Sequence, residues 1–229
     1  MRGLFVTGTD TGIGKTHASC AIIAALRSRG LRVFPFKPIA AGAAQAGERW
    51  VNEDTQSLLA AAGLDETDAS RVTPVLLREP MAPHIAAARE GVAIDLRAVH
   101  AAFLRGAAGS DFAVAEGVGG FCVPLADRLD TVDLARELAL PVVLVVGMRL
   151  GCLNHAFLTA AAIRAAGLPF VGWIANELAP RMNGLEENVE TLRQRLAAPM
   201  LARLPWVAAA TPAQLASCVD ISRLLEAAR

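Results

Sequence analysis

The first sixteen residues contain a pattern that few folds accommodate. An apolar run at residues 4–6 leads into a glycine-rich turn, and a helical pattern follows over residues 18–26. The turn reads Gly8-Thr9-Asp10-Thr11-Gly12-Ile13-Gly14-Lys15-Thr16. A strand, a glycine-rich turn ending in Gly-Lys-Thr, and a helix are typical, in this order, of a phosphate-binding loop. Five residues rather than four separate Gly8 from Gly14, but the order still predicts binding of a nucleoside triphosphate.

Each part of this turn has a physical role. Glycines let successive backbone N–H groups face one anion, and the start of the following helix adds the positive end of its dipole. Lys15 is expected to reach the outer phosphates, and the hydroxyl of Thr16 is expected to bind the Mg²⁺ that accompanies them. The alternative is a helix entered through an ordinary glycine-rich turn with an incidental lysine.

Apolar runs alternate with helical patterns along the chain. We expect strands at Leu4–Thr7, Arg32–Phe36, Phe112–Glu116, Val142–Gly147, Phe170–Asn176 and Met200–Leu204. We expect helices at Lys15–Arg29, Glu53–Ala62, Asp95–Gly106, Thr131–Leu138, Leu153–Ala166, Glu186–Leu196 and Pro212–Ala228, and a loop near the site at Ala40–Glu48. The continuous apolar run at residues 142–146 is typical of a strand covered on both faces. This alternation predicts an α/β fold of the P-loop NTPase type, with a mostly parallel twisted sheet, helices on both faces and one domain over residues 1–229.

Composition excludes several classes of protein. Hydrophobic residues make up 54% of the chain, enough for a large core, but no apolar run reaches the roughly 18 residues of a membrane span. We therefore expect a cytoplasmic protein that does not contact membranes. A formal net charge of +0 offers no basic surface for nucleic acid. The four cysteines and four histidines are scattered, so a zinc site is not expected and the cysteines are interpreted as small apolar core residues.

Polar residues stand where the predicted strands end, which is where parallel α/β folds bind ligands. Lys37 could stabilise charge on a transferring phosphoryl group, or could be an ordinary solvated lysine. Asp54 could bind Mg²⁺, or could only complement the dipole of the helix that it begins. Glu116, at the end of a buried strand and followed by glycines, is expected to hold Mg²⁺ opposite the loop threonine.

Two further candidates have equally plausible structural roles. Asn154 lies at a helix start that could bind a carboxylate or phosphate, but it could simply cap the helix. Asn176 ends a strand and could read the edge of a nucleobase. Trp206 could pack beside that base, although core packing is the commoner role of a lone tryptophan.

Taken together, these motifs resemble the dethiobiotin synthetase family nearly end to end. The matching segments are residues 6–11 with Lys15-Thr16, Lys37-Pro38, Pro83-His84-Ile85, Glu116-Gly117-Val118-Gly119-Gly120, Leu150-Gly151-Cys152-Leu153-Asn154-His155, Gly172-Trp173-Ile174-Ala175-Asn176 and Leu204-Pro205-Trp206. The resemblance implies an Mg²⁺-dependent enzyme that uses ATP and CO₂ to close 7,8-diaminononanoate into dethiobiotin, through a carbamate and its mixed anhydride with phosphate.

The resemblance also implies roles for individual residues. Catalysis would use Lys37, Lys15 and Thr11, and Mg²⁺ would be held by Thr16, Asp54 and Glu116. ATP would be bound by Gly12, Ile13, Gly14, Lys15, Thr16, Asp54, Glu116, Gly117, Val118, Gly119, Asn176, Glu177, Pro205, Trp206 and Val207. The diamine would meet Lys37, Ala41, Leu150 and Asn154. In this family the Leu150–Asn154 turn serves the substrate site of a second subunit, which implies a homodimer.

Some positions depart from the family, and two other classes remain open. Ala41 replaces a serine, Gly12 an acid, Arg149 a lysine and Glu177 an aspartate. Partner-regulated ATPases that position chromosomes or septa share this fold, but they carry a second lysine near the start of the loop, where this chain has Asp10. Cobyrinic acid diamide synthases carry an added glutamine amidotransferase domain, for which these 229 residues leave no room.

Overall fold

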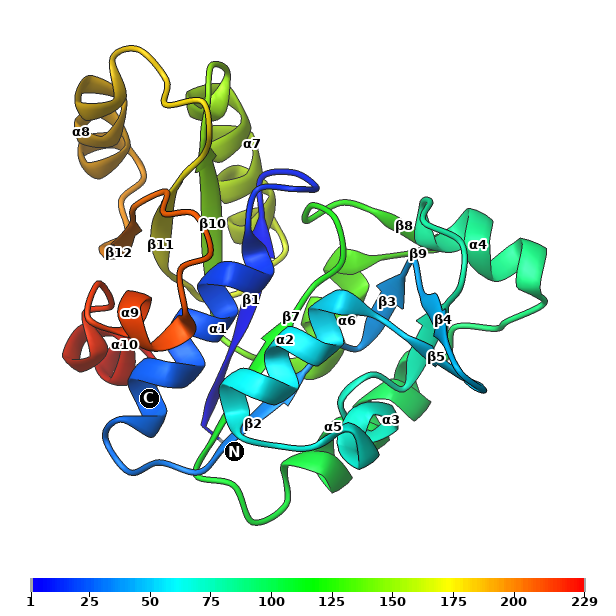
Figure 1. Ribbon diagram of the computed structural model, residues 1–229. Helices are drawn as coiled ribbons and strands as arrows, with labels where there is room; N and C mark the ends of the chain where they lie inside the picture. The colour runs from blue at the N-terminus through cyan, green and yellow to red at the C-terminus, as the bar shows by residue number, and fades with distance from the viewer. Residues whose placement is uncertain (1, 229) are drawn as a thin grey trace.

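The computed structural model describes residues 2–228 and is built around one sheet of six parallel strands (Figure 1). In spatial order the strands are β12 (Met200–Leu204), β11 (Phe170–Glu177), β10 (Val142–Met148), β1 (Gly3–Gly8), β7 (Phe112–Glu116) and β2 (Val33–Phe36). The strands predicted from the sequence are all present, with bounds that agree within one residue. The predicted parallel α/β fold is confirmed.

Helices cover both faces of this sheet (Figure 1). One face packs against α1 (Lys15–Arg27), α2 (Glu53–Ala62), α9 (Pro212–Ala216) and α10 (Ile221–Ala227). The other packs against α5 (Leu96–Ala107), α6 (Thr131–Leu138), α7 (Cys152–Ala165) and α8 (Leu185–Arg195). Successive strand residues point to opposite faces, so Leu4 and Val6 join one apolar core and Phe5 joins the other. This two-sided burial explains the continuous apolar runs.

Smaller elements lie beside the carboxyl end of β2. Strand β3 (Ile39–Ala41) pairs with β6 (Val75–Leu77), β4 (Ala44–Ala46) with β5 (Arg49–Val51), and β8 (Pro124–Ala126) with β9 (Leu129–Asp130). The helical segments η1 (Glu66–Asp68), α3 (Ala69–Val72) and α4 (Pro83–Glu90) complete this part. The prediction of a loop over Ala40–Glu48 is wrong at residues 40–41 and 44–46, whose backbone pairs in β3 and β4. Elements this short carry too few residues to show a period in the sequence.

The single helix predicted over Pro212–Ala228 is also wrong. It is divided into α9 and α10, and the segment between them pairs with the edge strand β12. Val219 forms an antiparallel bridge with Ala202, and the Asp220 N–H donates to the Leu201 carbonyl at 2.8 Å. Asp220 then caps α10 by accepting from the Arg223 N–H at 3.0 Å. The edge of the sheet therefore interrupts the helix.

The cysteines differ in burial. Cys20 and Cys152 are buried, as expected of small apolar core residues, and burial raises the pKa of the Cys20 thiol to about 12. Cys122 is exposed, so for this residue the core interpretation is wrong.

Within residues 2–228, none of the helices has the length and apolar character needed to cross a membrane.

The strand order places the candidate site. From β1 the chain runs out to the edge strand β2, returns to β7 and then crosses β1 to reach β10. Ligands of such sheets bind where the strand order reverses, beyond the carboxyl ends of the strands. The register sets Val6 beside Glu116 and Phe36 beside Ala115. The glycine-rich loop, Lys37 and Glu116 therefore meet at one edge of the sheet.

Candidate active site

The glycine-rich loop joins β1 to α1 in a conformation that requires glycine. Gly12 and Gly14 have φ angles of +71° and +83°, in the left-handed region that side chains rarely occupy. A Cβ on Gly14 would lie 2.2 Å from the Nδ2 of Asn176. That Nδ2 atom donates to the carbonyl of Ile13 at 2.8 Å, and Asn176 is 4% exposed. In this structure Asn176 supports the loop from below.

Lys15 begins α1 and is buried at the base of the loop. Its Nζ donates to the backbone carbonyl of Asp10 at 2.9 Å. Burial, and then the positive charge of Lys37, lower the pKa of Lys15 to about 8. The Lys15 ammonium is thus hydrogen-bonded to a neutral carbonyl rather than to a carboxylate. A bound phosphate would supply the negative charge.

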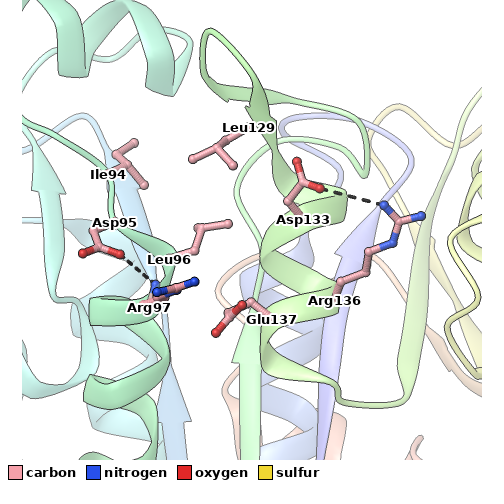
Figure 2. A pocket seen from close by; sticks show the side chains of 8 residues that line it. All are labelled: Ile94, Asp95, Leu96, Arg97, Leu129, Asp133, Arg136 and Glu137. Carbon is pink, nitrogen blue, oxygen red and sulfur yellow. Dashed lines mark hydrogen bonds and ion pairs between the residues drawn. The ribbon is translucent and has the colours of Figure 1, made fainter.

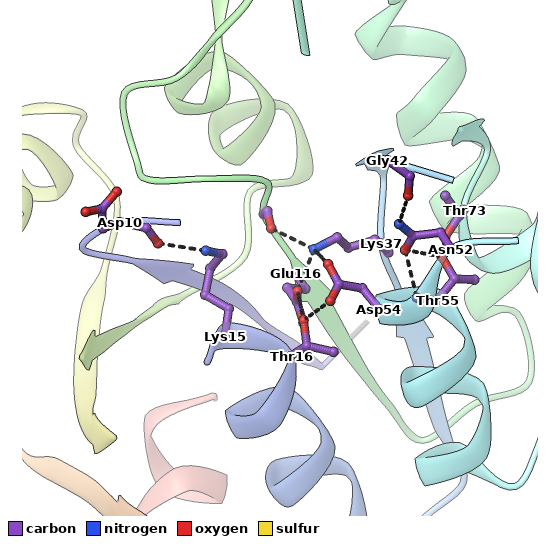
Figure 3. Close-up of polar contacts among 11 residues, drawn as sticks. Asp10, Lys15, Thr16, Lys37, Gly42, Asn52, Asp54, Thr55, Thr73 and Glu116 are labelled. Carbon is purple, nitrogen blue, oxygen red and sulfur yellow. Dashed lines mark hydrogen bonds and ion pairs between the residues drawn. The ribbon is translucent and has the colours of Figure 1, made fainter. Parts of the chain in front are cut away.

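A cluster of four side chains lies beside Lys15 (Figure 3). The Thr16 hydroxyl lies 2.8 Å from both Asp54 Oδ1 and Glu116 Oε1, and its single proton is shared between them. The Lys37 Nζ lies 2.5 Å from Glu116 Oε1 and 3.0 Å from Asp54 Oδ2. It also donates to the Gly117 carbonyl at 3.3 Å. Glu116 ends β7 and Lys37 directly follows β2, whereas Thr16 and Asp54 lie in the first turns of α1 and α2.

Charge pairing makes this burial tolerable. Lys37 is 2% exposed and Glu116 is fully buried, and an unpaired charge in such a place would cost several kcal/mol, of the order of 3–5 when one partner of a buried pair is removed. Burial lowers the pKa of Lys37, but the Glu116 and Asp54 carboxylates together outweigh it, so the pKa is raised. Burial likewise raises the pKa of Asp54, but Lys37 and Thr16 outweigh it and the pKa is lowered. Both shifts favour the charged forms of Lys37 and Asp54.

The cluster has the donor set of a magnesium site. Glu116 Oε2 is buried and has no hydrogen-bond partner among the described residues, although a carboxylate oxygen needs one. Residues 2–228 contain no group of three or more His, Cys, Asp or Glu side chains placed to hold a metal. Two carboxylates and a hydroxyl are nevertheless enough for Mg²⁺, which usually keeps several waters and takes its other ligands from substrate phosphates. Thr16, Asp54 and Glu116 fit this ion.

A cavity of about 670 Å³ opens over the loop and the cluster. Its walls include these residues predicted from the sequence: Thr11, Gly12, Gly14, Lys15, Thr16, Lys37, Ala41, Asp54, Val118 and Gly119. Its opposite side, which the sequence analysis missed, is formed by Pro80, Met81, Ala82, Pro83 and Val123. Pro83, the first residue of α4, and Pro80 just before the helix were the available indication of a rigid turn there. The cavity combines a charged floor with a largely apolar wall.

The lysine content of the chain also points to these two positions. The only lysines in the sequence are Lys15 and Lys37. Apart from the histidines, every other basic side chain is an arginine. An ammonium is a compact point charge, whereas a guanidinium is a broad planar fork. Lysine is therefore used in this chain only where the structure places a cation under the cavity.

Other predicted residues lie outside this cavity. Glu177 pairs with Arg203, with 2.7 Å between Oε1 and Nε. Trp206 and Val207, which follow β12 directly after Pro205, are 57% and 50% exposed. Leu150 is 95% exposed and Asn154 is exposed, at the start of α7. Ile13 and Gly117 are buried beneath the cavity floor, with Ile13 packed against Gly147.

A second hollow lies between α5 and α6, and none of its residues lines the first cavity (Figure 2). Its acidic groups already have structural partners. Asp95 caps α5 by accepting from the Arg97 N–H at 2.9 Å, and Asp133 accepts from the Asp130 N–H at 3.0 Å. These contacts explain Asp95 and Asp133 as helix-capping groups, and Glu137 Oε1 lies 3.1 Å from His100 Nδ1.

Comparison with known proteins identifies relatives over nearly the whole chain. The family described as "AAA domain" matches residues 2–214. The "ATP-dependent dethiobiotin synthetase BioD" of Aromatoleum aromaticum is 53% identical over 220 residues, 96% of this chain and 97% of the relative. The protein of the same name from Xanthomonas euvesicatoria is 49% identical over 219 residues, again 96% of this chain and 97% of the relative.

Solved structures agree on the fold at much lower identity. A septum site-determining protein MinD from Pyrococcus horikoshii, complexed with Mg-ADP, has a TM-score of 0.56 and 18% identity, covering 99% of this chain and 94% of that protein. A ParA family ATPase from Chlorobium tepidum has a TM-score of 0.56 and 14% identity, covering 97% and 92%. These likenesses concern the P-loop NTPase fold alone. On the near full-length identity to its relatives, the chain belongs to the family of ATP-dependent dethiobiotin synthetases.

Proposed function

We propose that this protein joins CO₂ to 7,8-diaminononanoate at the expense of ATP, forming dethiobiotin, ADP and phosphate. The names of its relatives support an ATP-dependent dethiobiotin-forming enzyme. The observation that carries the proposal is the Thr16–Lys37–Asp54–Glu116 cluster at the floor of a cavity with a largely apolar wall. The charged floor suits phosphates and a carbamate, and the wall suits an aliphatic chain.

The reaction needs no nucleophilic side chain. One substrate amine adds to CO₂ and loses a proton, giving a carbamate. A carbamate oxygen attacks the γ-phosphorus of ATP, and the bond to ADP breaks. The second amine attacks the carbonyl carbon and loses a proton as phosphate leaves, which closes the cyclic urea. The protein contributes position and charge, as is general in phosphoryl transfer.

The charged residues divide this work. The loop from Gly12 to Thr16 offers its N–H groups to the triphosphate, and Lys15 exchanges the Asp10 carbonyl for phosphate oxygens. Lys37 is placed to neutralise the carbamate and the transferring phosphoryl group, where a fixed cation acts on developing charge. Thr16, Asp54 and Glu116 would hold Mg²⁺, which supplies charge neutralisation at the phosphates. Thr11 faces the same cavity and is placed to contact the phosphoryl group.

The adenine site lies beside the loop at the carboxyl ends of β11 and β12. The register sets Asn176 next to Leu204, so the segment Pro205–Val207 begins one residue beyond that pair. We place the adenine between Asn176–Glu177 and this segment, with Gly117, Val118 and Gly119 lining the phosphate side. Exposed Trp206 offers an aromatic face for stacking.

The diamine occupies the cavity in front of Lys37, and its carboxylate reaches a second copy of the chain. Ala41 lines the cavity without a hydroxyl, so the hydrogen bond of the family's serine is lost, at a cost of about 1 kcal/mol. Leu150 and Leu158 leave apolar surface exposed at α7, 95% and 63% respectively. This surface supports a homodimer in which the Leu150–Asn154 turn completes the other subunit's site.

Two broader features belong to the same proposal. Residues 1–229 act as one domain, which is supported by the single six-stranded sheet that receives elements from both ends of the chain. The enzyme works in the cytoplasm, which is supported by its use of ATP, a metabolite of that compartment.

The test is phosphate release from MgATP and bicarbonate, with and without 7,8-diaminononanoate. We expect release only with the diamine, together with a product of the mass of dethiobiotin. Omission of bicarbonate and replacement of the diamine by glutamine serve as controls. Release that does not depend on the diamine, or no release at all, would overturn the proposal.

A further inference from the structure

Asp10 connects the phosphate-binding loop to a second segment of the chain. Its backbone carbonyl accepts from the Lys15 Nζ at 2.9 Å, and its Oδ1 accepts from the Thr11 N–H at 2.7 Å. Its Oδ2 accepts from the Nη2 of Arg149, 139 residues away in the sequence. The two residues that donate these hydrogen bonds to Asp10, Thr11 and Lys15, both line the cavity. The position of this one residue therefore affects two groups of the candidate site.

Arg149 directly precedes the Leu150–Asn154 turn, which the proposed dimer offers to the other subunit. The Arg149 N–H donates to the Gly147 carbonyl at 2.9 Å, and the Arg149 carbonyl accepts from the Cys152 N–H at 3.0 Å, at the first residue of α7. Gly151 closes the turn with a φ of +95°. Leu150, at its corner, is 95% exposed. Because the backbone on both sides is hydrogen-bonded, the Arg149 side chain is tied to the position of the turn.

The backbones on either side of this ion pair are also joined. Gly8 lies beside Val145 in the parallel register of β1 and β10, and the Thr9 N–H donates to the Val145 carbonyl at 3.1 Å. The Arg149–Asp10 pair extends this connection past the ends of the strands. Its side chains are 48% and 44% exposed, and such a pair contributes little to stability by itself. Its contribution is expected in the placement of the loop.

We propose that Arg149 is a positioning residue that holds the phosphate-binding loop, through Asp10, in register with the Leu150–Asn154 turn. The proposal rests on the proposed function, because only a turn that meets the diamine gives this link a role in catalysis. A ligand that moves the turn then moves Asp10, and with it the loop. Nucleotide and diamine affinities are thereby coupled, and such coupling is reciprocal.

The placement of the loop can be observed directly, because Lys15 and Lys37 are the only lysines. Labelling with ¹⁵N-lysine gives two backbone amide signals, which the Lys37→Met variant assigns. In the ligand-free protein, Arg149→Met and Asp10→Asn are each expected to shift the Lys15 signal and leave the Lys37 signal in place. Arg136→Met breaks a surface pair of similar exposure, 51% and 36%, and is the matched control.

The functional consequence is measured by calorimetry. The dissociation constant of a non-hydrolysable ATP analogue with Mg²⁺ is determined with and without saturating diamine. We expect the wild-type ratio to be about fivefold or more, and expect it to fall toward one in Arg149→Met and in Asp10→Asn. The double variant should add nothing further, as for two residues that act through one contact, and Arg149→Lys should restore part of the ratio.

The outcomes separate this inference from the proposed function. An unchanged Lys15 signal or an unchanged ratio in both single variants would overturn the role of Arg149, while dethiobiotin formation by the wild type would leave the proposed function intact. A wild-type ratio of one, with both ligands bound, would also overturn the inference alone. Failure of the wild type to form dethiobiotin would overturn both. If Arg149→Met does not fold, Asp10→Asn, which keeps the shape of the side chain, decides the matter.

Discussion

At the scale of single residues, the site depends on a lysine enclosed by two carboxylates. Lys37 is nearly inaccessible, and its ammonium has Glu116 on one side and Asp54 on the other. The same carboxylates carry the oxygen atoms that fit Mg²⁺. The charge on Lys37 therefore acts on the substrate and also balances the cluster when the protein is free of ligands.

Replacing Lys37 by methionine should separate these two contributions. The turnover number should fall by about 10²–10³, because a fixed cation at the developing charge is lost, while binding of the nucleotide persists. The variant also leaves two carboxylates facing each other, so Mg²⁺ should raise its melting temperature more than that of the wild type. Steady-state kinetics, nucleotide titration and thermal unfolding with and without Mg²⁺ measure these effects. Collapse of nucleotide affinity would show that the role assigned to Lys37 is wrong.

At the scale of elements, the loop between β1 and α1 shows how local and distant constraints combine. Its glycines were predicted from the motif, and their positive φ angles confirm the need for them. The contact beneath Gly14 comes from Asn176, on a strand whose place next to β10 no local pattern specifies. A motif in the sequence thus predicts the shape of the loop, but the residue that supports it is visible only after the sheet is assembled.

Two matched variants test this support. Gly12→Ala and Gly14→Ala both place a side chain at positive φ, at a cost of about 1–2 kcal/mol. A Cβ at Gly12 meets nothing within 4 Å, whereas at Gly14 it would lie 2.2 Å from Asn176 Nδ2. Gly14→Ala should therefore lose about 1–3 kcal/mol more of unfolding free energy, because it also disrupts a buried hydrogen bond. Urea denaturation measures the unfolding free energy of both variants. Equal losses in the two would show that Asn176 does not support the loop.

The ion pair at the start of β2 and β7 predicts a pH dependence of stability. Hydrogen bonds from the Arg32 side chain and backbone hold the pKa of Asp111 at about 2. A carboxyl with a lowered pKa stabilises the fold above its unfolded pKa of about 3.9, and this contribution is lost as the pH falls toward about 2. The wild type should exceed Asp111→Asn in unfolding free energy near neutral pH, with the gap closing in acid. Urea denaturation across pH measures it, and Arg32→Met should narrow the gap without closing it, because the Arg32 backbone N–H still donates to Asp111 Oδ2.

At the scale of the whole molecule, both faces of the sheet are covered by helices, yet α7 leaves apolar surface exposed. Leu158 on α7 is 63% exposed, and Leu150, two residues before α7 begins at Cys152, is 95% exposed. In the proposed homodimer this surface meets a second copy, and the adjacent turn reaches that copy's diamine. A substitution that prevents the two copies from associating should therefore also lower diamine-dependent turnover.

Leu158→Asp should shift the protein toward monomers and lower diamine-dependent turnover, because a carboxylate in an apolar interface is not solvated. Leu104→Asp changes a leucine of similar exposure, 53%, on α5 and should leave both properties intact. Sedimentation velocity over a range of concentrations gives the oligomeric state. A Leu158→Asp variant that associates as the wild type does would place the dimer interface elsewhere.

The amino-acid sequence by itself determined the strands and most of the helices, the phosphate-binding loop and the family, because apolar periodicity and glycine placement act over a few neighbouring residues. Short paired strands and the broken C-terminal helix were missed, because partners distant in the sequence determine them. Only the tertiary structure decided that Lys37 meets Glu116, 79 residues away, and that Asn176 reaches Ile13, 163 residues away. Such contacts depend on strand order and register, which result from the packing of two cores and not from any local pattern.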